Sequence, residues 1–308
     1  MIPQFPEFSK LVADHKDVIE AYTRIFPPYS DYTFPSLWSW NIHERIELSD
    51  LNGNLVVRFT DYVTNEKFLS FLGNKEVGKT LESLFILIES STDHLSYLKL
   101  IPEHNLHDVH LLNGYEAVED LDNHDYVYSI PELTTFSGKK YEKKRNQLAQ
   151  FVGKYESKLV ELSLSSCEAR RQMQNLCEFW TQRQLEKRND VFNDVSALKR
   201  LFLLANSPEI VGIGIFVDDR LCGYNITELN HQGFATGLFE LADTAYAGIY
   251  AHLRKQLAMK LQERGAEWFN HQQDLGIAGL RISKKRFHPA FFLKKFIIRR
   301  TRKSHCDA

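Results

Sequence analysis

Residues 233–274 read GFATGLFELADTAYAGIYAHLRKQLAMKLQERGAEWFNHQQD and carry the clearest fold signal of the chain. In the middle of this stretch an apolar residue recurs at every fourth position and a glycine then follows: Ile249, Leu253, Leu257, Leu261 and Gly265. This spacing predicts a helix over residues 247–265, because side chains four apart share one helix face and glycine often ends a helix. The segments GFATGLFELAD and EWFNHQQD on either side predict strands.

The same order of elements is predicted in both halves of the chain. Upstream of the quoted stretch, IVGIGIFVDDRLCGYNITEL predicts a hairpin that turns at Asp218-Asp219. In the first half, RIELSDLNGNLVVRF predicts a hairpin around Asn52-Gly53, and KFLSFLG, TLESLFILIESS and YLKLIPE predict a strand, a helix and a strand. We interpret the parallel as two copies of one α/β unit. Pro131 and Gly138 mark the boundary, which divides the chain into residues 1–135 and 136–308.

The composition is that of a globular protein without a membrane span or a disulfide framework. The chain has 308 residues, 43% hydrophobic and 25% charged, with a formal net charge of -2. No apolar run approaches the roughly 20 residues that cross a bilayer. The four cysteines form no CxxC pair, and no His/Cys spacing predicts a metal site. With no signal peptide recognisable at the N-terminus, we predict a cytoplasmic protein.

The C-terminal region is basic. Between Leu275 and Cys306 there are ten lysines and arginines and no acidic residue. Such a segment is typical of contact with an anionic partner, including the acceptor end of a tRNA, although a solvated tail explains it equally well.

The string GNKEVGKT, from Gly73 to Thr80, matches the phosphate-loop pattern. No strand ending in an acidic metal ligand follows it, and Lys75 and Glu76 fill positions where small residues are usual. We therefore interpret the string as a strand-to-helix turn with Thr80 as the helix N-cap, and keep an ATP site as the alternative.

The predicted catalytic residues are Glu240 and Asp243, at the end of the strand before the long helix. Carboxylates beside a helix N-terminus can hold an amine or orient a nucleophile. Asp243 also fits a simpler role as a helix cap. Tyr246 and Gly248 open the helix and join the same candidate pocket.

Two further segments supply candidate substrate-binding residues. In SGKKYEKKRNQLAQF, a helix would place Tyr141 and Arg145 on one face with Leu148 and Val152, and an inward arginine favours a carboxylate or phosphate. In NHQQDLGIAGLRISKKRFHP, polar residues end a strand and basic residues lie on the next helix. The predicted binding set from the two segments is Lys140, Tyr141, Arg145, Asn146, Asn270, Asp274, Arg281 and Lys284. Structural ion pairs and core packing are the competing explanation for each of them.

Together with FELADTAYAGIY, these blocks resemble soluble relatives of the C-terminal catalytic domain of phosphatidylglycerol lysyltransferase, over nearly the whole chain. The resemblance implies an α/β (α+β) fold of two tandem GNAT-like acyltransferase units with mixed central sheets flanked by helices. It also implies aminoacyl transfer from an aminoacyl-tRNA, with an acid at Asp243 contacting the transferred amino acid. Tyr246 stands where the resemblance implies a basic residue, which argues against lysine as the transferred group. Gln272 stands where many of the soluble relatives have an acid.

The predicted function is therefore acyl transfer to an unknown amine or hydroxyl acceptor, either a small molecule or a lipid headgroup, with no certain cofactor. Such a reaction needs positioning and oxyanion stabilisation more than covalent catalysis. An aminoacyl-tRNA is the favoured donor. The alternatives are a CoA-dependent N-acyltransferase with an acyl-CoA donor, a non-catalytic ligand-binding module, and a nucleotide hydrolase built on the Gly73–Thr80 loop.

Overall fold

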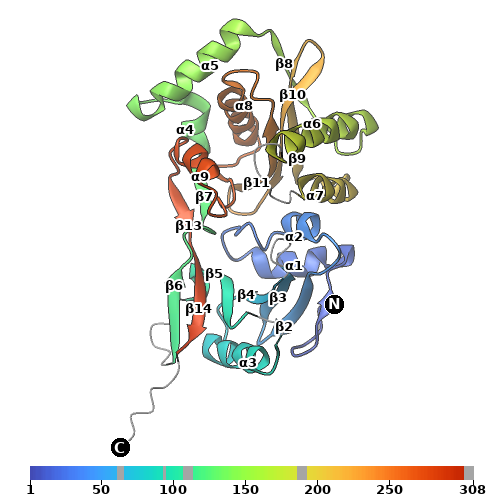
Figure 1. Ribbon diagram of the computed structural model, residues 1–308, viewed down its shortest axis with the longest axis vertical. Coiled ribbons are helices and arrows are strands. Elements are labelled where there is room, and N and C mark those ends of the chain that lie inside the picture. The colour runs from blue at the N-terminus through green and yellow to red at the C-terminus, as the bar shows by residue number, and fades with distance from the viewer. Residues whose placement is uncertain (61–65, 93–94, 107–113, 186–192, 302–308) are drawn as a thin grey trace, which may run out of the picture. The chain divides into compact units, whose positions relative to one another are not determined.

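The computed structural model describes residues 1–60, 66–92, 95–106, 114–185 and 193–301. The chain forms two compact units, which Figure 1 labels by element. The first unit is Met1–His124 together with the segment that begins at Leu293, and the second is Asp125–Phe292. This division differs from the predicted one, because residues 125–135 belong to the second unit and the C-terminal strand belongs to the first. Within the described residues, no helix has the length and apolar character needed to cross a membrane.

The second unit is built on a seven-stranded sheet of described residues, in the order β13-β7-β12-β11-β10-β9-β8. The strands are β7 (Asp125–Ser129), β8 (Ser157–Glu161), β9 (Ile210–Val217), β10 (Arg220–Leu229), β11 (Phe234–Ala242), β12 (Trp268–Asn270) and β13 (Phe291–Leu293). The helices are α4 (Ile130–Thr135), α5 (Glu142–Lys154), α6 (Cys167–Leu185), α7 (Asp194–Leu201), α8 (Ile249–Glu263) and α9 (Ala278–Lys285). Figure 1 shows α6 and α7 on one face of the sheet and α4, α5 and α8 on the other.

The sheet opens between β11 and β12. These strands run parallel, but only Phe234, Ala235 and Thr236 of β11 are paired with β12. The rest of β11, through Ala242, is paired on its other side with β10 alone. The strands therefore diverge toward the C-terminal end of β11, where α8 begins.

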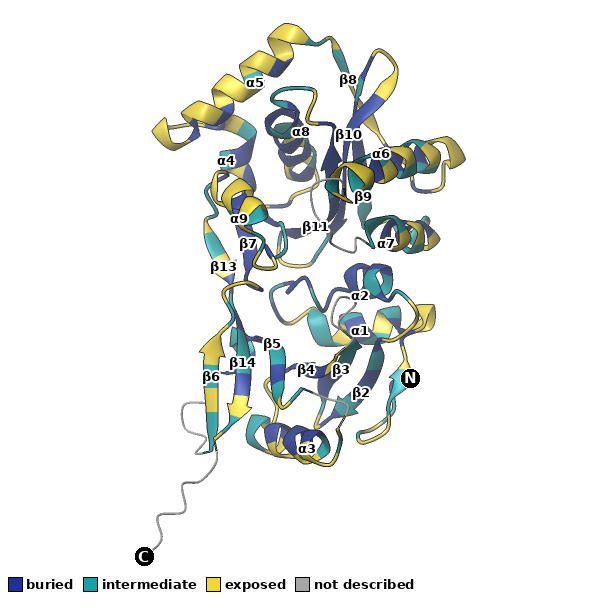
Figure 2. Cartoon of the chain, viewed as in Figure 1, coloured by how far each residue is buried: buried dark blue, intermediate teal, exposed yellow. Residues whose placement is uncertain are grey.

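The helix predicted from the quoted stretch is confirmed. In α8 the residues Ile249, Leu253, Leu257 and Leu261 are buried and pack in the core of the second unit. Figure 2 shows the buried side of α8 turned toward the sheet. The hairpin turn at Asp218-Asp219 is also confirmed, with both residues at positive φ.

The first unit repeats the same order with a smaller sheet. Its strands are β1 (Ser9–Lys10), β2 (Glu47–Leu51), β3 (Asn54–Thr60), β4 (Lys67–Leu72), β5 (Tyr97–Pro102), β6 (Tyr115–Glu119) and β14 (Lys295–Arg300). Its helices are α1 (Lys16–Thr23), α2 (Phe34–Trp40) and α3 (Val77–Glu89). One sheet has the order β1-β2-β3-β4 and another has the order β5-β14-β6. Both units thus place a helix pair, a hairpin, a strand, a helix and a strand in sequence, as the predicted duplication requires.

The phosphate-loop string is a turn between β4 and α3, as interpreted, but Thr80 is not the N-cap. The helix begins at Val77, so Thr80 lies within its first turn and is buried. The side chain of Asn54 fills the loop, where it donates to the Lys75 carbonyl (2.7 Å) and accepts from the Lys75 amide (3.1 Å). Lys79 is exposed and pairs with Glu76. The amides of Gly73 and Lys75 are therefore occupied by asparagine side chains, and the space of the loop is filled by Asn54.

The basic C-terminal region is largely neutralised in the first unit. Lys294 pairs with Glu119 (2.6 Å), and Arg300 pairs with Glu82 (2.6 Å) and Glu89 (3.1 Å). Lys295 is fully buried beside Asp31. These cations hold β14 in place, and Arg299 lies over the Tyr97 ring at 4.8 Å. Four basic residues of the region belong to the second unit, namely Arg281, Lys284, Lys285 and Arg286, and two lie outside the described residues, namely Arg302 and Lys303.

Candidate functional site

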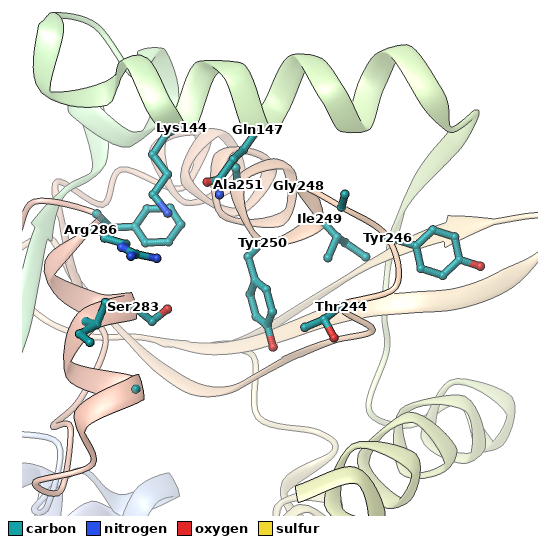
Figure 3. A pocket seen from close by; sticks show the side chains of 14 residues that line it. Lys144, Gln147, Thr244, Tyr246, Gly248, Ile249, Tyr250, Ala251, Ser283 and Arg286 are labelled. Carbon is teal, nitrogen blue, oxygen red and sulfur yellow. The ribbon is translucent and has the colours of Figure 1, made fainter. Parts of the chain in front are cut away.

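A pocket of about 280 Å³ lies in the second unit where the start of α8 faces α5 and α9. Figure 3 shows side chains from all three helices around it. The lining residues are Lys144, Gln147, Thr244, Tyr246, Ala247, Gly248, Ile249, Tyr250, Ala251, Gly279, Ile282, Ser283, Arg286 and Phe287. The first turn of α8 forms one wall. The N–H groups of Ile249 and Ala251 in this turn donate to the carbonyl oxygens of Tyr246 (3.1 Å) and Gly248 (3.0 Å), so the turn contributes mainly the positive end of the helix dipole.

Gly248 allows α5 to pack directly against the start of α8. Its φ is +87°, in the left-handed region that favours glycine. A Cβ atom on Gly248 would lie 2.0 Å from the carbonyl oxygen of Gln147 on α5. The glycine therefore fixes the distance between the two helices and brings the α5 side chains over the pocket.

Lys144 is the inward basic residue of α5. Its side chain is 8% exposed, and its Nζ lies 3.6 Å from the centre of the Phe287 ring. Burial, together with the smaller effect of the neighbouring Arg254 and Arg286, lowers the pKa of Lys144 to about 8. No described acidic residue pairs with it. Lys144 therefore carries a poorly compensated charge beside the pocket.

The pocket lining contains two cations and no acid. Arg286, at the end of α9, supplies the second positive charge. Figure 3 shows Lys144 and Arg286 reaching toward the same space from opposite helices. Together with the positive end of the α8 dipole, they make the pocket suited to an anionic group.

The predicted catalytic residue Glu240 is part of a buried ion pair outside this pocket. Arg254 of α8 donates to both of its carboxylate oxygens, one contact measuring 3.2 Å. Asn225 donates to Oε2 at 3.2 Å, and His271 Nε2 lies 3.5 Å from Oε1. Although burial alone would raise it, the attraction of Arg254 leaves the pKa of Glu240 well below its usual value. A carboxylate held in this way is a structural anion.

The second predicted catalytic residue, Asp243, caps the turn before α8 and is 5% exposed. Its Oδ1 accepts the amide N–H of Ala245 at 3.0 Å. Arg183 and Arg220 also approach it, at 3.4 and 3.5 Å. The predicted helix-capping role is wrong, because the N-cap of α8 is Gly248 and Asp243 closes only the turn that precedes it, beside a pair of arginines.

The predicted face of α5 is shifted by one residue. Arg145 is exposed and donates to the carbonyl oxygens of Phe136 (2.6 Å) and Gly138 (2.7 Å), so it does not face the pocket. Tyr141 is buried, but its hydroxyl bonds Glu132 and the Phe287 carbonyl. Lys140 pairs with Glu132 at 2.7 Å, and Asn146 is exposed. None of these four lines the pocket.

The predicted residues after β12 form a buried polar cluster. Asp274 is fully buried and is held in a two-point contact by Arg281, with both distances 2.8 Å. Asn270 donates to Asp125 at 3.0 Å. The Nζ of Lys284 donates to the carbonyl groups of residues 271–273, and burial lowers its pKa to about 7. The cluster fixes the chain between β12 and α9 and lies outside the pocket lining.

Of the predicted set, Tyr246 and Gly248 line the pocket, and sequence reasoning missed most of the rest. The missed polar residues are Lys144, Gln147, Thr244, Tyr250, Ser283 and Arg286. A helical phase based on Phe151 instead of Val152 would have pointed to Lys144, because Phe151 is buried and Val152 is 58% exposed.

Sequence and structure comparisons agree with this architecture. Residues 24–299 match the family model described as "Phosphatidylglycerol lysyltransferase, C-terminal". The chain belongs to this family. The match includes most of both units.

A protein of unknown function from Bacteroides thetaiotaomicron has the same fold, with a TM-score of 0.83 at 21% identity, covering 98% of this chain and 100% of that one. L-PGS from Bacillus licheniformis gives a TM-score of 0.64 at 12% identity, covering 99% and 95%. An uncharacterized Mycoplasmoides gallisepticum protein is 21% identical over 176 residues, which is 57% of this chain and 56% of that protein. The match thus spans little more than half of that relative.

The GNAT-like fold predicted from the resemblance is therefore confirmed. The family and the fold indicate an acyltransferase.

Proposed function

We propose that the second unit transfers an acyl group, most specifically an aminoacyl group from an aminoacyl-tRNA, to an amine or hydroxyl acceptor. The pocket between α5, α8 and α9 holds the phosphate-bearing part of the donor. The observation that carries this proposal is the pair of cations, Lys144 and Arg286, in a lining without acids beside the start of α8.

The divergence of β11 from β12 supports the same location. Beyond Thr236, the β12-facing edge of β11 has no β12 partner, and this edge leads to the turn at which α8 begins. An acyl carbonyl lying along such an edge can be held by backbone groups, which is the positioning and oxyanion stabilisation that acyl transfer needs. Tyr250 reaches this edge, where its hydroxyl accepts the Ala242 N–H at 3.2 Å.

The donor can be a charged tRNA or an acyl-CoA, because both carry phosphates next to the activated acyl group. For a tRNA donor, the pocket cations are better candidates for binding the acceptor end than the basic residues of β14 and its neighbour Lys294. Lys294, Lys295 and Arg300 already have acidic partners. An acyl-CoA donor is supported by the same cation pair, since a diphosphate fits the start of a helix.

Binding measurements with single-residue variants test the proposal. We expect Lys144→Gln and Arg286→Gln each to weaken binding of CoA, or of an aminoacylamino derivative of adenosine 5′-phosphate, by about 10-fold. Isothermal titration calorimetry gives the dissociation constants. Lys143→Gln is the matched control, because Lys143 lies on the same helix but is exposed and outside the lining.

The outcomes of these measurements distinguish the two donors, a non-catalytic module and a wrong donor site. Preference for the adenosine derivative over CoA supports an aminoacyl-tRNA donor, and the reverse preference supports acyl-CoA. Tight binding without transfer to any of a panel of amines and alcohols supports a non-catalytic module. Unchanged affinity in both pocket variants would contradict the proposed donor site.

A further inference from the structure

The carboxylate of Asp243 is shared by two arginines from different elements. Arg183 comes from the last turn of α6, and Arg220 is the first residue of β10. Each reaches Asp243 with one nitrogen, at 3.4 and 3.5 Å. The arginine side chains are 46% and 59% exposed, whereas that of Asp243 is 5% exposed. Most guanidinium N–H groups therefore remain open to a ligand from solvent.

The cluster carries an excess of positive charge. Among the described residues, Asp243 is the acid paired with either arginine, so two positive charges face one negative charge. Both guanidinium groups also lie over the ring of Phe179, with their carbon atoms 4.5 and 5.9 Å from its centre. The aromatic ring and the shared carboxylate hold the two guanidinium groups close together. Two neighbouring guanidinium groups are a suitable arrangement for binding an oxyanion.

The arginine pair holds the turn whose next residues line the donor pocket. Asp243 is followed directly by Thr244, and both Thr244 and Tyr246 line the pocket. The positive charge of Arg220 acts on the hydroxyl of Tyr246. Tyr246 in turn packs on Tyr155 (5.0 Å), over which Lys154 lies at 5.3 Å. A ligand that extends from the pocket past Tyr246 thus meets further positively charged side chains.

The expectation that Asp243 holds the amino group of a transferred amino acid meets a physical obstacle here. An ammonium group placed on this carboxylate would lie beside two guanidinium groups that already compensate it. The Coulomb repulsion between like charges at this separation opposes binding. A carboxylate or phosphate in the same place is attracted by both arginines.

We infer that the Asp243–Arg183–Arg220 cluster binds an oxyanion of the substrate, a carboxylate or a phosphate, and that Asp243 acts as a positioning residue for the two arginines. The inference rests on the proposed acyl transfer, and it limits the substrates to those in which the acyl group or the acceptor carries an oxyanion. The oxyanion belongs either to the acyl group, as in an acidic aminoacyl group, or to the acceptor. A cationic aminoacyl group is disfavoured.

Matched ligand pairs that differ in charge test this inference. The first pair is the glutamylamino and lysylamino derivatives of adenosine 5′-phosphate, which are stable amides that imitate the end of a charged tRNA. The second pair is O-phosphoethanolamine and ethanolamine, which represent an acceptor amine with and without a phosphate. Calorimetry measures affinity, and phenylglyoxal labelling read by mass spectrometry measures protection of Arg183 and Arg220.

We expect at least one anionic member to bind about 10-fold more tightly than its partner and to protect both arginines. The preference should fall to about 1 in an Arg183→Gln/Arg220→Gln variant. Arg171→Gln is the control, because Arg171 lies on the same helix and pairs with Glu168 on the surface. A preference for the glutamyl derivative assigns the oxyanion to the acyl group, and a preference for phosphoethanolamine assigns it to the acceptor.

Equal or tighter binding of the lysyl derivative, together with no protection by phosphoethanolamine, would overturn the inference. So would a charge preference that survives in the double variant. Failure of the proposed donor site is recognised separately. In that case neither CoA nor any adenosine derivative binds, while protection of the arginines by phosphoethanolamine still decides whether the cluster binds an oxyanion.

Discussion

Lys144 and Arg145 are neighbours on α5, but the helix turns them into different environments. Lys144 lies under the helix against the Phe287 ring, and Arg145 lies outside and caps two carbonyl groups. The acidic residues near the site also differ in how closely basic side chains hold them. Glu240 and Asp274 are each held in a two-point arginine contact, whereas Asp243 is held loosely between two arginines. Charge compensation, more than residue type, therefore decides which polar residue is available to a ligand.

The binding of an anionic ligand should depend on pH through Lys144. The folded-state pKa of about 8 means that the ammonium is present below that pH and is lost as the pH rises through it. We expect the affinity for CoA or pyrophosphate to fall between about pH 7 and pH 9. Calorimetry at several pH values measures this, and Lys144→Gln should remove most of the dependence. An affinity that rises over this range would contradict the assignment.

Glu240 should contribute to stability rather than to the chemical step. Replacement by Gln leaves Arg254, which is 2% exposed, without its carboxylate. Breaking a buried pair from one side typically costs about 3–5 kcal/mol. We expect urea unfolding of Glu240→Gln to show such a loss. Glu168→Gln, which breaks a surface pair on α6, should leave the urea midpoint unchanged. A stable but inactive Glu240→Gln would restore a catalytic role.

At the scale of elements, the start of α8 is the critical contact. Strand β11 ends just before the turn at Asp243. Gly248 then adopts a left-handed backbone conformation at the start of α8, and α5 packs against that glycine. The pocket therefore depends on contacts between elements that are far apart in the sequence, because α5 ends at Lys154 and α9 begins at Ala278. In the first unit the equivalent turn is filled by Asn54, so the same order of elements forms no comparable phosphate loop.

A pair of glycine variants separates backbone strain from helix packing. Gly248→Ala places a Cβ 2.0 Å from the Gln147 carbonyl, whereas Gly265, at φ +80°, has nothing within 4 Å of that position. We expect Gly265→Ala to cost about 1–2 kcal/mol for its left-handed backbone. Gly248→Ala should cost more and should also weaken donor binding, because α5 must move. Thermal unfolding and calorimetry measure the two effects, and equal behaviour of the variants would contradict the packing role.

At the scale of the whole molecule, the C-terminal strand belongs to the first unit although it follows the second unit in the sequence. Strand β14 lies between β5 and β6, with Ile298 fully buried and Lys295 paired to Asp31. The basic residues Lys294, Lys295 and Arg300 therefore have a structural role within the first unit, whereas Arg286 of the same region lines the pocket of the second unit. Family membership extends over both units, so both are parts of one inherited architecture.

Removal of β14 should destabilise the first unit. A chain that stops at Phe292 loses the buried Ile298 and leaves the nearly buried Asp31 without Lys295. The combined loss is about 5 kcal/mol or more, from the lost apolar burial and the lost pair between Lys295 and Asp31. Circular dichroism melting should show a lower first transition, while a chain that stops at Thr301 should melt like the full-length protein. An unchanged melt of the shorter chain would show that β14 is dispensable.

The sequence by itself determined the repeated order of elements, the two tight hairpin turns and the long helix after Asp243. These features depend on local periodicity and on turn residues, which act within a few positions along the chain. Only the tertiary structure decided which charges remain available. Glu240, Asp274 and Lys284 are compensated by partners from other elements, and the return of β14 to the first unit is likewise a long-range pairing. Lys144 became a pocket residue because Gly248 lets α5 approach α8, a contact between segments that spacing along the chain does not reveal.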